Sequence, residues 1–360
     1  MNETLAQISD LAFEAALAGY VVALVCYAVE LASRRGVDAT PTEAASAALR
    51  AGRGGTSTIT RTGEGRDGTG AEAIGLIPAA PVASWGVRFG RAAVVVTVVA
   101  VVANVLSIIT RGMSVGRLPL GNMYEFTSVI CAAATICWLI VLAKTAARTM
   151  GVFVMLPVVI LACVAGTVLY VPAAPVVPAL NSYWKWIHVT TVALSSSVLM
   201  VSGAASVLYL LRGRYERRLP AGAVVTASTG AGPAGSGSPQ SAGAPGAAGS
   251  LSARLPSLPT LDRIAYRTAI VAFPVYTFAV MAGALWAEVA WGRYWGWDPK
   301  ETCAFVTWVI YASYLHARST AGWRGRPAAW ISVVGFASIL FNLFVINMVV
   351  SGLHSYAGLN

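Results

Sequence analysis

The sequence predicts an all-α integral membrane protein with about eight transmembrane helices, both termini outside, and a tryptophan-rich loop on the outer face. Three observations lead to this fold class. Hydrophobic residues make up 57% of the 360 residues and charged residues 11%, against roughly a quarter charged in soluble domains. Eight apolar runs are each about 20 residues long, the length that crosses a bilayer core of roughly 30 Å. Basic residues gather after every second run.

The apolar runs fall into three groups separated by two low-complexity segments. No Lys or Arg precedes the first run, so it is expected to be a retained helix rather than a signal peptide. Segments rich in Gly, Ala, Thr, Ser and Pro predict disordered cytoplasmic linkers. The expected regions are a first helix in 1–35, a linker in 36–85, four helices in 86–218, a linker in 219–262, and three helices in 263–360. The runs lie near 11–32, 89–110, 123–144, 151–171, 189–211, 267–290, 300–317 and 328–350.

The distribution of basic residues predicts the topology. Twenty of the 25 Lys and Arg residues follow the first, third, fifth and seventh runs. Lys and Arg are enriched in cytoplasmic loops, so we expect a multi-pass protein of the cytoplasmic membrane with both termini and the tryptophan-rich loop on the extracytoplasmic side. The net charge of +10 then reflects topology, and no nucleic-acid partner is expected.

The five cysteines lie inside apolar runs and form no C-x-x-C pair. This pattern predicts small buried hydrophobic residues rather than disulfides or a zinc site. No nucleophile triad, phosphate loop or metalloprotease helix is found in the sequence.

Aromatic residues are unusually dense in one outer connection. Residues 291–302 read Trp-Gly-Arg-Tyr-Trp-Gly-Trp-Asp-Pro-Lys-Glu-Thr. Interfacial Trp and Tyr are normally scattered anchors, whereas a cluster in a glycine-interrupted loop is suited to stacking on a flat group. The candidate cofactor-binding residues of this loop and its neighbours on the same side are Trp184, Trp286, Trp291, Tyr294, Trp295, Trp297 and Asp298.

The chain has three histidines, His188, His316 and His354. His188 is expected at the outer start of the fifth helix and His354 beyond the outer end of the eighth. Two neutral imidazoles beside aromatic rings suit six-coordinate haem iron, although each could instead be a solvated interfacial residue. His316 follows Pro299 by about 25 Å of helix, so it cannot share that iron. It is either a structural interfacial residue or a ligand whose second partner comes from elsewhere.

Asp298 begins a helix-start pattern. Asp at the N-cap, Pro299 at the first helical position and Glu301 three residues after the cap predict a capped helix rather than acid–base catalysis. Lys300 and Arg293 could instead meet acidic groups such as haem propionates. Glu125, at the start of the third helix, is expected to be a helix-dipole partner.

These motifs together resemble the CcsA/ResC family (actinobacterial CcsB type) of System II cytochrome c maturation, whose members carry a tryptophan-rich WWD domain. The resemblance spans residues 118–356. Cys303 departs from the family pattern, which usually has another tryptophan there. The blocks that carry the resemblance are Leu118-Pro-Leu-Gly-Asn-Met-Tyr-Glu125, Val177-Pro-Ala-Leu180 leading to His188, Trp291–Thr302, Tyr314-Leu-His316-Ala-Arg318 and Gly352-Leu-His354-Ser-Tyr356.

The resemblance implies a function and a set of roles. His188 and His354 would be the external axial ligands of haem held against the WWD surface, and His316 would belong to a transmembrane haem site completed by a ResB-type partner. Haem b, as the transported substrate, would be presented for thioether attachment to the CxxCH motif of apocytochrome c. Haem lyase (cytochrome c synthase) activity would need the ResB-type partner, and apocytochrome c and thiol-reducing proteins would be further partners. The alternatives are a haem exporter or carrier without attachment activity, or an unrelated solute transporter.

Overall fold

The computed structural model describes residues 2–33, 85–174, 182–218, 251–347, 349–350 and 352–353. Within these ranges every regular element is helical, which confirms the predicted all-α fold class. The first predicted linker and most of the second lie outside the described residues. The long helices are α1 (Glu3–Ser33), α3 (Trp85–Val115), α4 (Met123–Lys144), α5 (Gly151–Thr167), α6 (Tyr183–Glu216), α7 (Leu258–Trp291), α8 (Pro299–Ser319) and α9 (Arg326–Phe341); the short elements are η2 (Arg148–Met150), η5 (Leu251–Arg254) and η6 (Asn342–Ile346).

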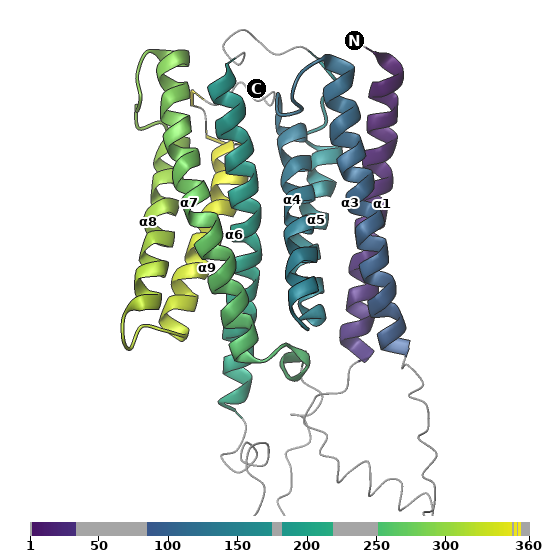
Figure 1. Ribbon diagram of the computed structural model, residues 1–360, viewed down its shortest axis with the longest axis vertical. Helices are drawn as coiled ribbons and strands as arrows, with labels where there is room; N and C mark the ends of the chain where they lie inside the picture. The colour runs from purple at the N-terminus through teal and green to yellow at the C-terminus, as the bar shows by residue number, and fades with distance from the viewer. Residues whose placement is uncertain are drawn as a thin grey trace, which may run out of the picture.

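Successive long helices run in alternating directions through one bundle, as Figure 1 shows. The start of α1, the start of α6, the connection from α7 to α8 and the end of α9 all lie at the same end. We call this end the tryptophan end, because it holds residues 291–298. This arrangement agrees with the predicted placement of both ends of the bundle on one side of the membrane.

Seven of the described helices are long and apolar enough to cross a membrane: α1, α3, α4, α5 with η2, α6, α7, and α9 with η6. The more polar α8 is not among them, since it carries Lys300, Glu301, His316 and Arg318. Its 21 residues nevertheless extend about 31 Å, and α8 runs beside α7 and α9 in Figure 1. An integral membrane protein is therefore confirmed, and the eighth crossing stays a prediction.

Helices α1 and α3 pack closely because their facing residues are small. The buried face of α3 carries Gly86, Gly90, Ala93 and Ala100 at spacings of three, four and seven residues. A Cβ atom built on Gly19 of α1 would lie 2.8 Å from the Cβ of Ala100. In membranes, small residues allow helix backbones to approach and gain van der Waals contact. This pair forms one edge of the bundle (Figure 1).

Helix α6 lies in the middle of the bundle and packs on α4, α7 and α9. It is rich in buried serines, and four of their hydroxyls donate hydrogen bonds: Ser195 to the carbonyl of Thr191, Ser197 to that of Ala193, Ser202 to that of Ala265, and Ser206 to the hydroxyl of Ser332. Because polar atoms are satisfied within or between helices, α6 can be buried without destabilising the core. It therefore provides a rigid support for side chains at the tryptophan end.

Three boundaries differ from the sequence-based expectation. Helix α6 begins at Tyr183, so His188 lies in its second turn rather than at its start. Helix α7 begins at Leu258, four residues before the end of the predicted linker 219–262, because Pro259 favours a first helical turn. The last predicted run, 328–350, is an α-helix only to Phe341 and continues as the π turn η6.

Candidate functional site

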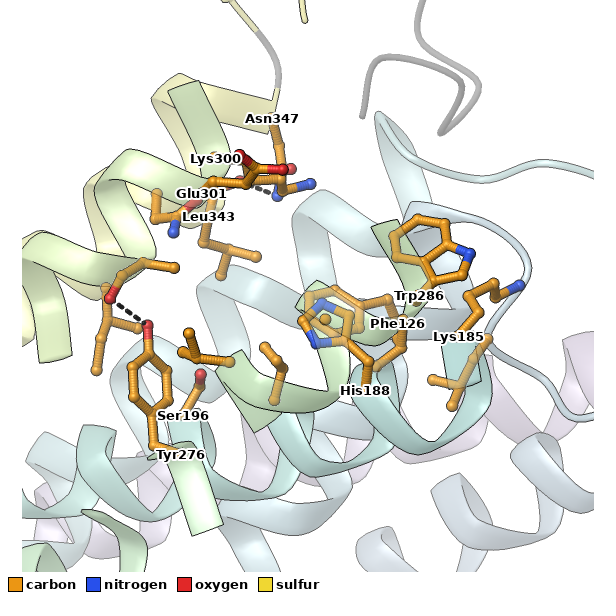
Figure 2. A pocket seen from close by; sticks show the side chains of 18 of the residues that line it. Phe126, Lys185, His188, Ser196, Tyr276, Trp286, Lys300, Glu301, Leu343 and Asn347 are labelled. Carbon is orange, nitrogen blue, oxygen red and sulfur yellow. Dashed lines mark hydrogen bonds between the residues drawn. The ribbon is translucent and has the colours of Figure 1, made fainter. Parts of the chain in front are cut away.

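A cavity of about 210 Å³ lies at the tryptophan end. Its wall comes from the start of α4, the first turns of α6, the second half of α7, the start of α8 and the π turn η6 (Figure 2). Most of this wall is apolar. The basic and acidic side chains on it are His188 and Lys185 from α6 and Lys300 and Glu301 from α8. The arrangement is that of a pocket for a largely apolar ligand with a few fixed polar contacts.

His188 is held in one tautomer. Its Nδ1 lies 2.7 Å from the carbonyl oxygen of Ala279 in α7, and because a carbonyl only accepts, Nδ1 must carry the proton. Nε2 then has a lone pair, the form in which imidazole binds a metal. The ring also stacks on Trp286, with centroids 6.0 Å apart and planes inclined by 24°. A histidine whose other ring nitrogen donates to a backbone carbonyl is the usual arrangement of a metal ligand.

Gly283 makes room for this histidine. A Cβ atom built on Gly283 would lie 2.7 Å from both Cε1 and Nδ1 of His188, closer than side chains tolerate. The absence of a side chain on α7 therefore allows the His188 ring to reach the Ala279 carbonyl.

Replacing Gly283 by alanine is expected to push the ring aside and break its hydrogen bond to Ala279. The affinity of the purified chain for haem should fall about 10- to 100-fold, as for loss of an outer-shell partner, measured by haem titration. Gly213→Ala in α6 is the control, because its Cβ would meet only ordinary contacts at 3.7 Å and beyond. Unchanged haem affinity in Gly283→Ala would contradict the proposed role.

Four of the predicted aromatic residues line the cavity: Trp286, Trp291, Tyr294 and Trp295. Trp286 is 3% exposed and lies 5.1 Å from Trp291 between ring centroids. The structure thus brings together rings from α7 and from the loop after it beside His188.

Two other predicted aromatic residues do not line this cavity. Trp297 has a left-handed backbone, with φ 58°, and is 67% exposed. Its ring packs edge-on against Trp295 at 5.8 Å, outside the pocket. Trp184 packs on Tyr183 at 5.0 Å and is likewise absent from the cavity wall.

Asp298 caps α8, which confirms the helix-start interpretation. One carboxylate oxygen accepts from the backbone N–H of Lys300 at 3.2 Å. Oε2 of Glu301 accepts from the backbone N–H of Asp298 at 3.2 Å and of Gly296 at 2.8 Å, which completes a capping box and fixes the tryptophan loop. Asp298 is not part of the cavity wall.

The second oxygen of Asp298 binds the C-terminal segment. Oδ1 accepts from the backbone N–H of Leu353 at 2.8 Å. His354 itself lies outside the described residues, but it follows Leu353 directly in the chain. Asp298 therefore connects the start of α8 to the segment that carries the third histidine.

Replacing Asp298 by alanine is expected to lower the free energy of unfolding by about 1–2 kcal/mol through loss of the cap and to release Leu353. With His354 as the axial ligand that the family resemblance implies, the iron of bound haem should then lose that ligand, seen as a change from a low-spin to a high-spin absorption spectrum. Asn2→Ala is the control, since it removes the hydrogen bond from the Leu5 N–H to Asn2 Oδ1 (3.2 Å) at the start of α1, away from both Leu353 and the cavity wall. A low-spin spectrum in Asp298→Ala would exclude the positioning role.

His316 lies far from this cavity. Ala304 is the last α8 residue on the cavity wall, and His316 follows it by twelve residues, about 18 Å along the helix. Its side chain is exposed on the outside of the described bundle. The structure thus agrees with the expectation that His316 cannot share an iron with His188.

Glu125 is the centre of a buried ion network that the sequence did not predict. Nε of Arg111 lies 3.2 Å from Oε1 of Glu125, and Nη1 of Arg117 lies 2.7 Å from Oε2. The N–H of Gly121 donates to the same carboxylate at 2.7 Å. Arg111 also approaches Asp10 at 3.5 Å. The network ties α1, α3 and α4 together beside the cavity, a larger role than the predicted interaction with the helix dipole.

Fold and site together define a multi-pass membrane protein with an imidazole at the wall of an aromatic, mostly apolar pocket. The sequence profile of one family, "Cytochrome C assembly protein", matches residues 120–354. The chain belongs to this family, which confirms the resemblance to CcsA/ResC proteins. The matched range contains all three histidines and the whole tryptophan loop.

Curated relatives cover most of the chain. The cytochrome c biogenesis protein CcsA of Parasynechococcus marenigrum (strain WH8102) is 34% identical over 296 residues, covering 78% of this chain and 92% of the relative. The CcsA protein of Synechococcus sp. (strain CC9605) is 36% identical over the same length and coverage, and that of Porphyra purpurea is 33% identical over 281 residues, covering 75% and 88%.

One solved structure shares the fold. The cytochrome c haem lyase CcmF superposes with a TM-score of 0.57 at 15% sequence identity, over 96% of this chain and 47% of the CcmF chain. The chain thus corresponds to about half of that larger protein.

Proposed function

We propose that the cavity at the tryptophan end receives haem b as substrate, and that His188 is one of the axial ligands of its iron. Membership of the cytochrome c assembly family makes the chain a cytochrome c biogenesis protein that handles haem. The observation that carries the site assignment is the Nδ1–H of His188 donating to Ala279 at 2.7 Å, which leaves Nε2 as the ligating nitrogen beside a pocket of aromatic rings.

The second external ligand is His354. Leu353, the residue before it in the chain, donates its backbone N–H to Asp298 at the start of α8. The cap of α8, the tryptophan loop and the segment that contains Leu353 meet at Asp298. We therefore expect His188 and His354 to approach the same ligand. The rings of Trp286, Trp291, Tyr294 and Trp295 provide the stacking surface.

His316 belongs to a separate haem site. It is exposed on α8 about 18 Å beyond the last residue of the cavity wall, and the chain has no further histidine to complete an iron site there. A ResB-type membrane partner would supply the other ligand. Haem would pass from this site to the outer cavity, on the extracytoplasmic face of the cytoplasmic membrane.

The reaction served is thioether formation with apocytochrome c. Each cysteine thiol of a CxxCH motif adds across a haem vinyl group: a sulfur–carbon bond forms and the thiol hydrogen passes to the other vinyl carbon, with no net oxidation. Thiol-reducing proteins would keep the cysteines reduced beforehand. We assign no catalytic acid or base in this chain; its residues hold the haem in position for the two thiols.

Co-expression separates this synthase role from a haem carrier. The chain, a ResB-type partner and an apocytochrome c are produced in a host without its own maturation genes. Covalent haem on the apocytochrome supports the synthase complex, and haem bound to the chain without attachment supports the exporter or carrier. A purified chain without haem absorption would exclude both and favour an unrelated transporter.

A further inference from the structure

Lys185 is a buried cation that lacks a hydrogen-bond partner. It is 3% exposed, and within the described part of the chain its Nζ makes no hydrogen bond. Its contact is with the ring of Trp186, whose centroid lies 3.5 Å from Nζ. Cation–π attraction offsets only part of the cost of removing an ammonium group from water. A buried, uncompensated amine of this kind calls for an anion.

The neighbouring charges do not supply that anion. Glu125 is already bonded by Arg111 and Arg117, and Asp10 lies next to Arg111. The three cations Arg111, Arg117 and Lys185 thus have two carboxylates nearby, those of Glu125 and Asp10. Because the arginines bind both carboxylates, the positive charge of Lys185 is left uncompensated. Both arginines also donate to backbone carbonyls, Arg111 to Val171 and Arg117 to Ala174, so their donors are used within the protein.

Lys185 lines the same cavity as His188. The two residues are three positions apart on α6 and therefore share a face of the helix. Figure 2 shows the Lys185 side chain beside the indole of Trp286, on the side of that indole away from His188. A flat ligand bound at Nε2 of His188 and stacked among the aromatic rings would bring its edge toward this amine.

We propose that Lys185 binds a carboxylate on the edge of the flat ligand held by His188, which in haem is a propionate group. The ligand's negative charge compensates the buried ammonium, and the charged hydrogen bond fixes the rotation of the macrocycle within the pocket. This assignment rests on the proposed haem function. The sequence suggested Arg293 and Lys300 as propionate partners instead. Arg293 is exposed on the loop, whereas Lys300 lines the same cavity from α8 and is therefore compared directly in the test.

A thermodynamic cycle that changes the ligand carboxylates and the Lys185 side chain, separately and together, tests the proposal. The purified full-length chain is titrated with haem b and with its dimethyl ester, in which both carboxylates are neutralised. Wild-type protein should bind the ester about 10- to 100-fold more weakly than haem. Lys185→Met should weaken haem binding by a similar factor and bind haem and ester almost equally, while Lys185→Arg should keep the preference for haem.

Two further variants make the outcome decisive. Lys144→Met, an exposed lysine at the far end of α4, should behave as wild type. If Lys185→Met still prefers haem over the ester as wild type does, or if Lys300→Met alone removes the preference, the assignment to Lys185 is overturned. A wild-type chain that binds haem and ester equally would overturn it without any variant. If wild type binds neither probe, the proposed haem function fails as well.

Discussion

Replacing His188 by glycine is expected to remove haem from the outer cavity. The variant loses the hydrogen bond to Ala279 and the stacking on Trp286, together with the proposed Nε2 ligand. Loss of an outer-shell partner alone typically costs about 10- to 100-fold in metal affinity, so loss of the ligand itself should exceed this range. The measurement is the haem absorption of the purified chain, combined with titration by haem b.

Added imidazole provides the control for His188→Gly. The glycine leaves a space the size of the lost ring, so free imidazole should restore a low-spin spectrum if the fold is intact. His316→Gly should leave the outer-site spectrum unchanged, because His316 is remote from the cavity. An unaltered spectrum in His188→Gly would exclude His188 as a ligand of the bound iron.

Replacing Glu125 by alanine is expected to have the largest effect on stability. Arg111 and Arg117 would remain buried without their shared carboxylate, and the N–H of Gly121 would lose its acceptor. Breaking a buried ion pair by removing one partner costs about 3–5 kcal/mol. Thermal unfolding in detergent should therefore show a large drop in the midpoint.

Glu216→Ala is the matched control for Glu125→Ala. Glu216 pairs with Arg212 at 2.8 Å near the other end of α6, with the carboxylate 36% exposed, so its removal should cost less than about 1 kcal/mol. Equal effects of the two substitutions would mean that the network around Glu125 is not a stabilising core of the bundle.

Local sequence patterns predicted the helices and part of the site. The apolar runs located α3, α4 and α7 because a membrane helix needs a long uninterrupted stretch, whatever it packs against. The density of aromatic residues pointed to Trp291, Tyr294 and Trp295, and alternating charge placed His188 at the same end. These properties depend on the chain's own composition and on membrane thickness.

Features that depend on which helix faces pair were not predictable. The role of Gly283 depends on the packing of α7 against His188, which the sequence does not show. Lys185 likewise resembles an interfacial anchor in the sequence, because its burial depends on neighbouring helices. Likewise, the density of aromatic residues in the loop could not show that Trp295 faces the cavity while Trp297, at φ 58°, faces outward. Such information is contained in the contacts between α4, α6 and α7 rather than in any one segment.

The π turn η6 has a consequence for the geometry of the C-terminal segment. A π turn contains one residue more than an α turn, and one residue corresponds to about 100° of rotation around a helix axis. Asn347, which follows the π turn and lines the cavity, is therefore turned by about that angle relative to a regular continuation of α9. The direction in which Asn347 faces is thus set by a single surplus residue, so deleting one residue in Asn342–Ile346 is expected to rotate Asn347 out of the cavity wall and change the shape of the pocket.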